Sequence, residues 1–493
     1  MTEASPPRGD GLLRLVPLLG GVVLASVVLA LPAPEGMAIE AWRVVAVTAL
    51  MVTWWIGEAV PVAATALVPV VAFPLLRVAP LDTVTAAYAH PLIFLFLGGF
   101  LLAVAFERWN LHRRIALAIL GRVGTRPIAL VGGFMAATAL LSMWISNTAT
   151  TVMMLPIGLS VIALVEQRGK GGDGGNFAVA LLLGIAYAAS IGGLGTLIGT
   201  PPNALVAAFL AESQGISVGF VAWLPIGLPL VALLLPAAWL ALTRLAFPVP
   251  RGAIPGAAQT IALERAAMGR LTTPEARVAL VFGATALLWV LRPVIAELVP
   301  GLPLSDSAIA ILGALMLFVI PAGGGRATPL LTWDWAKRIP WGVLLLFGGG
   351  LGLATAFSES GLAAWIAASL EALRHWPQLA VVLVVVAIVV FLTEIMSNTA
   401  AAAIFFPVIA ALAQSMGMLP AELLVPVALA ASCAFMMPIA TPPNAIVFGS
   451  ERLSHGQMAR AGLLLNILVI ALIPLWVEIL LRSGLLGQLV RGP

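Results

Sequence analysis

Long apolar stretches separated by short polar loops follow one another from Leu12 nearly to the C-terminus. An α-helix needs about 20 mostly apolar residues to cross the hydrocarbon core of a bilayer. The pattern therefore predicts an all-α, polytopic membrane protein. We expect about eleven transmembrane helices, at residues 11–31, 41–57, 60–77, 91–107, 177–212, 219–247, 275–297, 304–321, 340–358, 422–450 and 458–482.

Two further apolar stretches, at residues 127–165 and 377–413, are each interrupted near the middle by the same polar triplet. The triplet is Ser146-Asn147-Thr148 in the first stretch and Ser397-Asn398-Thr399 in the second. The arms beside each triplet have about 17 residues, which is borderline for a full crossing. Each stretch is therefore either a re-entrant hairpin or a pair of full spans, and both alternatives return the chain to the same side.

The second half of the chain repeats motifs of the first half. At an offset of 251 residues the first triplet falls on the second, and Phe96 falls on Phe347. The segment Thr200-Pro201-Pro202-Asn203 then matches Thr441-Pro442-Pro443-Asn444 at an offset of 241, because the first copy has a longer loop around residues 169–175. A fixed offset between matching motifs is typical of an internal duplication.

Each copy contains an odd number of crossings, so the second copy is expected to lie upside down in the membrane. The chain is thus predicted to have two inverted-topology repeats, with one hairpin in each. The predicted parts are a tail and first helix at 1–40, a first repeat at 41–247 with its hairpin at 127–165, a cytoplasmic linker at 248–274, and a second repeat at 275–493 with its hairpin at 377–413.

Composition agrees with a membrane protein, since 61% of the 493 residues are hydrophobic and only 9% are charged. The net charge of +4 is no nucleic-acid signal, because most of the basic residues lie in loops on one predicted side. That bias predicts a multi-pass protein of the inner (plasma) membrane with a cytoplasmic N-terminus and an outer C-terminus. The single cysteine, Cys433, excludes a disulfide within one chain.

The paired motifs have the chemistry of helix starts within apolar surroundings. In Thr200-Pro201 and Thr441-Pro442, a hydroxyl residue precedes proline, as at an N-cap and first helical position. If these starts converge with those of the two triplets, their backbone N–H groups and helix dipoles form an anion site without a basic side chain. No Lys, Arg or His lies within any of these segments.

A carboxylate dianion bound there would need compensating positive charge, because uncompensated charge in a low-dielectric site is costly. Sodium ions are the natural source. Hard oxygen ligands are available from Ser142, Asn147, Thr393 and Asn398 and from carbonyls at the breaks. For the two hydroxyls the alternative is a hydrogen bond to a preceding helix carbonyl. Glu394 either orients its hairpin or hydrogen-bonds to the second cation site.

These motifs, with the segment from Trp54 to Pro61 and the segments 146–156 and 393–400, resemble the divalent-anion/sodium symporter (DASS) family over almost the whole chain. The resemblance implies two re-entrant hairpins, an elevator-type transport mechanism and a homodimer. It implies that substrate is bound by Ser146, Asn147, Thr148, Thr200, Pro201, Ser397, Asn398, Thr399, Thr441 and Pro442. It also implies one sodium site at Ser142, Ser146, Asn147 and Gly199 and another at Thr393, Met396, Asn398 and Ala440.

The function expected from these features is sodium-coupled uptake of C4-dicarboxylates such as succinate, malate or fumarate. The partners are then a small dicarboxylate, sodium and membrane lipid, with no cofactor. The alternatives are a dicarboxylate exchanger of the same fold and a sodium/sulfate or citrate symporter. A membrane enzyme is not expected, because the sequence has neither paired catalytic aspartates nor an HExxH zinc motif.

Overall fold

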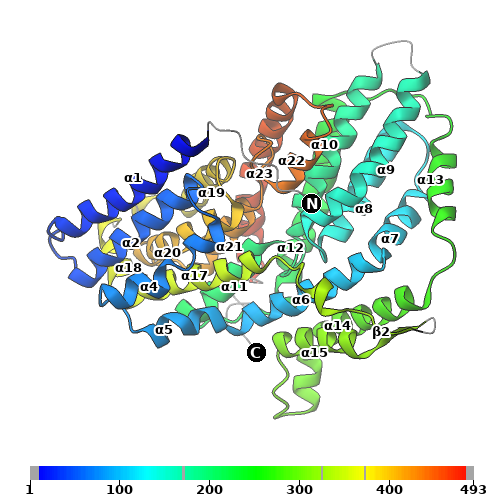
Figure 1. Ribbon diagram of the computed structural model, residues 1–493. Coiled ribbons are helices and arrows are strands. Elements are labelled where there is room, and N and C mark those ends of the chain that lie inside the picture. The colour runs from blue at the N-terminus through cyan, green and yellow to red at the C-terminus, as the bar shows by residue number, and fades with distance from the viewer. Residues whose placement is uncertain (1–9, 169–172, 324–325, 371–373, 485–493) are drawn as a thin grey trace.

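The computed structural model describes residues 10–168, 173–323, 326–370 and 374–484 (Figure 1). The start of the predicted N-terminal tail, part of the loop around 169–175 and the C-terminal end lie outside these residues. In the described residues the regular structure is helical apart from one short antiparallel pair of strands, β1 (Pro321–Gly323) and β2 (Arg326–Pro329). The predicted all-α class is confirmed.

The helices follow the apolar stretches in chain order. In the first half they are α1 (Asp10–Ala30), α2 (Ile39–Ile56), α3 (Val62–Thr65), α4 (Val68–Leu75), α5 (Leu81–Ala86), η1 (Ala87–Ala89), α6 (Pro91–Arg108), α7 (Leu111–Leu120), α8 (Pro127–Ser142), α9 (Asn147–Arg168), α10 (Asp173–Gly193), α11 (Pro201–Gln214), α12 (Phe220–Leu240) and the π-helical η2 (Ala241–Ala246).

The second half has a similar series. Its helices are α13 (Ala257–Ala267), α14 (Thr273–Leu298), α15 (Asp306–Val319), α16 (Trp333–Ala336), α17 (Trp341–Glu359), α18 (Leu362–Ser369), α19 (Gln378–Leu392), α20 (Asn398–Ser415), α21 (Pro420–Ala431), α22 (Pro442–Phe448) and α23 (His455–Arg482). The elements from α6 to α12 correspond in order to α17 to α23.

Three of the predicted spans are not single helices. The stretch 60–77 is divided into α3 and α4, and α4 itself contains Pro69 and Pro74. The stretch 177–212 is broken at 194–200, between α10 and α11, and 422–450 is broken at 432–441, between α21 and α22. Hydropathy does not reveal these breaks, because the glycine, proline and threonine residues that cause them lie among apolar residues.

Many of the helices are nevertheless long and apolar enough to cross a membrane. In the part of the chain that the structure describes, nine helical segments are long and apolar enough to cross a bilayer, and six further apolar helices are shorter. The shorter ones include α8 and α19, which are the first arms of the two triplet-containing stretches. The chain is therefore a multi-pass membrane protein.

Each triplet-containing stretch packs against the next helix along the chain. In the first half α10 lies beside both α8 and α9, and in the second half α21 lies beside both α19 and α20 (Figure 1). The approach of α8 and α10 is close, since a Cβ on Gly192 would lie 2.4 Å from the carbonyl oxygen of Ala139. Small residues at such contacts let helix backbones approach within the membrane.

The two halves interlock at their broken helices. The helix α22, which follows the second break, packs against α9 and α10 of the first half. Conversely α11, which follows the first break, packs against α20 and α21 of the second half. Each half therefore packs the helix that follows its break against the triplet-containing stretch of the other half.

The predicted linker at 248–274 contains a helix, α13, and is held by side chains of α7. Arg114 pairs with both carboxylate oxygens of Glu275 at 3.0 Å, and its guanidinium also donates to the carbonyls of Met268, Gly269 and Arg270. Glu275 is buried and completes a capping box with Thr272 at the start of α14. The linker is thereby fixed to the helix that precedes the first triplet-containing stretch.

Candidate functional site

The two triplets lie at helix starts, between the two arms of each stretch. In the first, α8 ends at Ser142 and α9 begins at Asn147, and the hydroxyl of Ser146 accepts a hydrogen bond from the Ala149 backbone N–H at 3.1 Å. In the second, α20 begins at Asn398 after Ser397, whose side chain forms no capping hydrogen bond. The prediction that each triplet interrupts its stretch at a helix start is confirmed.

The Thr-Pro segments also mark helix starts. Thr200 is the N-cap of α11 and Thr441 is the N-cap of α22, where its hydroxyl accepts from the Asn444 backbone N–H at 3.3 Å. The expectation that all four starts supply free N–H groups is wrong for these two, because two prolines occupy the first positions of each helix and proline has no N–H. Backbone donors for an anion must come from the triplets.

A cluster of three oxygen atoms lies where the end of α8, the start of α9 and α10 meet. Ser142 Oγ lies 2.5 Å from Asn147 Oδ1 and 2.7 Å from the carbonyl oxygen of Ala189 in α10. Ser142 is fully buried. A hydroxyl carries only one hydrogen, so it can satisfy only one of these two acceptors. With Asn147 Oδ1 facing the hydroxyl, the second acceptor shares this hydrogen or lacks a donor.

The same cluster occurs in the second half. Thr393 Oγ1 lies 2.7 Å from Asn398 Oδ1 and 2.9 Å from the carbonyl oxygen of Ala431 at the end of α21. Thr393 is also fully buried. The hydroxyls therefore do not bond to a carbonyl of their own helix, which was the alternative for these two residues. Both carbonyl oxygens, of Ala189 and Ala431, were missed from the sequence because a backbone atom has no residue-type signal.

The last residue of each Thr-Pro-Pro-Asn segment holds its break in place. Asn203 Nδ2 donates to the carbonyls of Gly193 and Thr196 at 3.0 and 2.9 Å. Asn444 Nδ2 donates to the carbonyls of Ala434 and Met437 at 3.2 and 3.0 Å. Both asparagines are fully buried. They were not assigned a role from the sequence, although their matched positions in the repeat were visible there.

Gly193 leaves room for two of the oxygen atoms expected at the first sodium site. A Cβ at this position would lie 3.1 Å from both Asn147 Oδ1 and the carbonyl oxygen of Gly199. The Asn147 side chain and the Gly199 carbonyl therefore both lie against Gly193. Of the residues expected at the second sodium site, Met396 and Ala440 are both buried, and Ala440 occupies the position that matches Gly199.

The breaks of the two halves meet directly. Thr200 Oγ1 lies 3.3 Å from Ser432 Oγ, and both side chains are buried. In the described residues, no hydrogen bond links one triplet to the other. The two triplets also differ in exposure: Thr148 is exposed, whereas Thr399 is buried. The structure thus joins the two breaks and places each triplet on a helix that packs against the opposite half.

Glu394 lies just before the second triplet and links it to the second break. Its carboxylate is buried and accepts from the backbone N–H groups of Phe435, Met436 and Met437 at 2.7 to 3.0 Å, and from Asn466 Nδ2 at 2.9 Å. Of the two alternatives for this residue, the structure favours an orienting role. The partners were not predictable, since they come from a loop and from α23.

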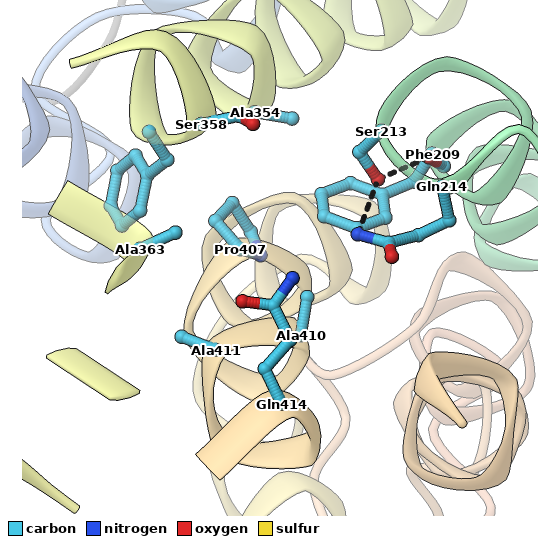
Figure 2. Close-up of a pocket in the computed structure, with 11 residues that line it drawn as sticks. Phe209, Ser213, Gln214, Ala354, Ser358, Ala363, Pro407, Ala410, Ala411 and Gln414 are labelled. Atoms are coloured by element: carbon cyan, nitrogen blue, oxygen red, sulfur yellow. Dashed lines mark hydrogen bonds between the residues drawn. The ribbon is translucent and has the colours of Figure 1, made fainter. Parts of the chain in front are cut away.

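A small pocket lies at the far ends of α11 and α20, away from their first residues (Figure 2). It is partly open, and its polar lining consists of Ser213, Gln214, Ser358 and Gln414. None of the candidate substrate or sodium residues lines it. The pocket is therefore separate from the helix breaks.

The helix breaks lack the clusters of ionisable side chains that usually bind metal ions. In the described part of the chain, no group of three or more His, Cys, Asp or Glu side chains is placed to hold a metal ion. The clustered oxygens of the breaks are instead neutral hydroxyl, amide and carbonyl groups. Such groups suit a weakly bound monovalent ion better than a resident transition metal.

Membrane transport proteins typically have helices that break within the membrane, with buried polar residues at the breaks. This chain has two such breaks, and the helix after each one packs against the other half. The family model described as the sodium:sulfate symporter transmembrane region matches residues 13–481. The chain belongs to this family, and the resemblance to divalent-anion/sodium symporters is thereby confirmed.

Proteins of known function are similar over nearly their whole length. The sodium-dependent dicarboxylate transporter SdcS of Staphylococcus saprophyticus is 41% identical over 474 residues, which cover 95% of this chain and 91% of that protein. SdcS of Staphylococcus aureus is 40% identical over 486 residues, which cover 97% of this chain and 93% of the relative.

Two solved structures have a similar fold at low sequence identity. MtrF of Neisseria gonorrhoeae, described as one of a class of antimetabolite efflux pumps, is 14% identical with a TM-score of 0.59 and covers 95% of this chain and 98% of its own. The YdaH transporter of Alcanivorax borkumensis is 15% identical with a TM-score of 0.54 and covers 82% of this chain and 88% of its own. These similarities concern the fold alone.

Proposed function

We propose that the protein imports C4-dicarboxylates such as succinate, malate or fumarate together with sodium ions. The observation that carries this proposal is the pair of oxygen clusters at Ser142 and Thr393. In each cluster three oxygens lie within hydrogen-bond distance but share one hydrogen. A cation among these oxygens removes the repulsion between their lone pairs, and hard cations prefer oxygen ligands.

The proposed sodium sites follow the two clusters. The first consists of Ser142, Ser146, Asn147 and Gly199, and the closeness of Asn147 Oδ1 and the Gly199 carbonyl to one point beside Gly193 supports it. The second consists of Thr393, Met396, Asn398 and Ala440. The relatives from both staphylococci are named sodium-dependent dicarboxylate transporters, which supports the same pairing of ion and anion.

The proposed substrate site uses the ends of the broken helices. Backbone N–H groups and hydroxyls at the starts of α9 and α20 donate to the carboxylates, and the dipoles of α11 and α22 add partial positive charge. Because no basic side chain belongs to these segments, the bound sodium ions neutralise the dianion. The residues are Ser146, Asn147, Thr148, Thr200, Pro201, Ser397, Asn398, Thr399, Thr441 and Pro442.

The architecture we propose has two inverted repeats, an elevator motion and a homodimer, with a cytoplasmic N-terminus and an outer C-terminus. Matched hydrogen bonds of Ser142 and Thr393, and of Asn203 and Asn444, support the repeat. The 16 residues of α8 and the 15 of α19 would span only about 24 and 22 Å as helices, against about 30 Å of hydrocarbon. These lengths favour a re-entrant first arm over a full span, whereas the second arms, α9 and α20, are long enough to cross.

Exchange of dicarboxylates without sodium is the alternative for the same fold. An amide of Asn147 turned by half a rotation would donate Nδ2–H to Ser142 and complete the cluster without an ion. Such a transporter would need another source of positive charge near its substrate. The helix breaks offer no basic side chain for this purpose, so symport is favoured.

The test is radiolabelled succinate uptake into proteoliposomes, with external sodium replaced by choline and with or without internal dicarboxylate. We expect uptake into empty vesicles that requires sodium. Ser142→Ala and Thr393→Val should each raise the half-saturating sodium concentration at least about tenfold, since each removes an ion ligand. The control is Ser160→Ala on α9, whose hydroxyl only bonds to Pro156 of its own helix. Uptake that persists in choline and needs internal dicarboxylate would establish exchange instead.

A further inference from the structure

We infer that Arg122, Arg126, Arg251 and Arg265 together form a binding surface for the headgroups of anionic phospholipids. We refer to these four side chains as the arginine surface. Two of them lie between α7 and α8, and two lie in the linker that leads to α14. The surface is separate from the helix breaks, so the inference does not depend on the proposed sodium coupling.

A backbone hydrogen bond joins the linker to the turn between α7 and α8. The Ile254 N–H donates to the carbonyl of Thr125 at 2.8 Å, and Ile254 is buried there. Arg126 is next to Thr125 in the chain, and Arg251 precedes Ile254 by three residues. The two arginines therefore belong to segments that lie side by side.

The second pair of arginines lies where α13 packs against α7, at the edge of the molecule (Figure 1). A Cβ on Gly121, which caps the end of α7, would lie 3.7 Å from a terminal guanidinium nitrogen of Arg265. Arg122 is the next residue, and its own guanidinium donates to the carbonyl of Ala118 in α7. The linker and the end of α7 thus bring four cationic side chains into one region of the protein surface.

The charge of the arginine surface is not neutralised within the described residues. There, none of its four members forms a salt bridge, and all four are exposed. The acidic residues of the linker and of the first turn of α14, Glu264 and Glu275, are already paired with Arg113 and Arg114. Arginine is charged throughout the physiological pH range. The surface therefore presents four positive charges to an anionic partner.

The outward face of α13 is apolar. The helix packs Ala257 and Ile261 against the protein, where both are buried. With about 3.6 residues per turn, the face turned away from them carries Leu263, which is 63% exposed, and the exposed Ala262, Ala266 and Ala267. Arg265 lies between the two faces. An exposed apolar face flanked by a basic residue is typical of a helix that lies at a membrane surface.

Charge and apolar exposure together favour a phospholipid over a soluble anion. The linker is predicted to be cytoplasmic, and the cytoplasmic leaflet carries a negative surface potential that attracts basic segments. A guanidinium group also binds phosphate oxygens through paired hydrogen bonds. The exposed Leu263 gains from contact with lipid chains, whereas a soluble anion offers it nothing. The partner that fits is therefore the phosphodiester headgroup of an anionic lipid.

The test is a titration of the purified full-length protein in neutral detergent with phosphatidylglycerol or phosphatidylcholine, with bound lipids counted by native mass spectrometry. Each arginine near an anionic lipid surface changes the affinity about fivefold. Arg122→Gln with Arg265→Gln should therefore weaken phosphatidylglycerol binding about 25-fold and leave phosphatidylcholine binding unchanged. Arg126→Gln with Arg251→Gln should have the same effect, so either variant can test the inference if the other does not fold.

The matched control is Arg77→Gln with Arg374→Gln. Both arginines are exposed, and neither forms a salt bridge in the part of the chain that the structure describes. Their loss should leave phosphatidylglycerol binding as in the wild type. Wild-type affinity in both variants of the arginine surface, or an equal loss in the control, would overturn the inference. Displacement of the lipid by millimolar inorganic phosphate at constant ionic strength would also overturn it, because the surface would then bind a soluble anion.

Discussion

Substitution of Asn203 or Asn444 tests whether the hydrogen bonds within the helix breaks stabilise the protein. Each amide donates two hydrogen bonds to carbonyls of its own break. A buried hydrogen bond contributes about 1 kcal/mol net, and an acceptor left without a donor raises the cost. Replacing either asparagine by alanine should therefore reduce the free energy of unfolding by about 2–4 kcal/mol.

The assay is unfolding of the purified protein in mixed micelles by increasing SDS, followed by tryptophan fluorescence. Asn176→Ala is the control, because that exposed amide makes a single hydrogen bond of 3.3 Å to Pro248. It should change stability by less than about 0.5 kcal/mol. The two break variants should lose similar amounts, since their hydrogen bonds correspond. If either one unfolds like the control, the asparagines do not hold the breaks.

Two other substitutions test separate parts of the molecule. Gly193→Ala should raise the sodium concentration needed for half-maximal uptake, because its methyl group would lie 3.1 Å from two proposed ligand oxygens; Ala434→Gly is its counterpart in the second half and should leave uptake unchanged. Arg114→Ala should destabilise the protein by about 2–3 kcal/mol, because it leaves the buried Glu275 without its cation. Arg113→Ala removes a pair with both side chains over 30% exposed and should cost under about 1 kcal/mol in the same SDS assay; equal costs for the two arginines would contradict this reasoning.

The helix starts at the triplets and Thr-Pro segments were predictable because polar and proline residues within apolar stretches have few other uses. The division of 60–77 and the full extent of the breaks were not, since Pro69, Gly195 and Gly199 hardly change the mean hydropathy of their segments. Side-chain motifs located the candidate site, and the repeat indicated which residues correspond.

The finer contacts depend on tertiary structure and could not be read from the chain. The carbonyls of Ala189 and Ala431 lie at the candidate site only because α10 and α21 pack against the triplet-containing stretches. In the same way, Glu394 was recognisable as unusual from its apolar surroundings, but its partners come from residues 41 to 72 positions away. Packing across such separations is set by the whole fold and not by local pattern.

The oxygen cluster at Ser142 joins the end of α8, the start of α9 and the interior of α10. An ion bound there would therefore cross-link three helices. While the ion is bound, the end of α8, the start of α9 and α10 would be held together as one stiff body. Without it, the Ser142 hydroxyl alone links these elements through its hydrogen bonds. In the sodium-coupled mechanism proposed above, ion loading would therefore set the rigidity of this junction, and a carrier without its ion would be softest there.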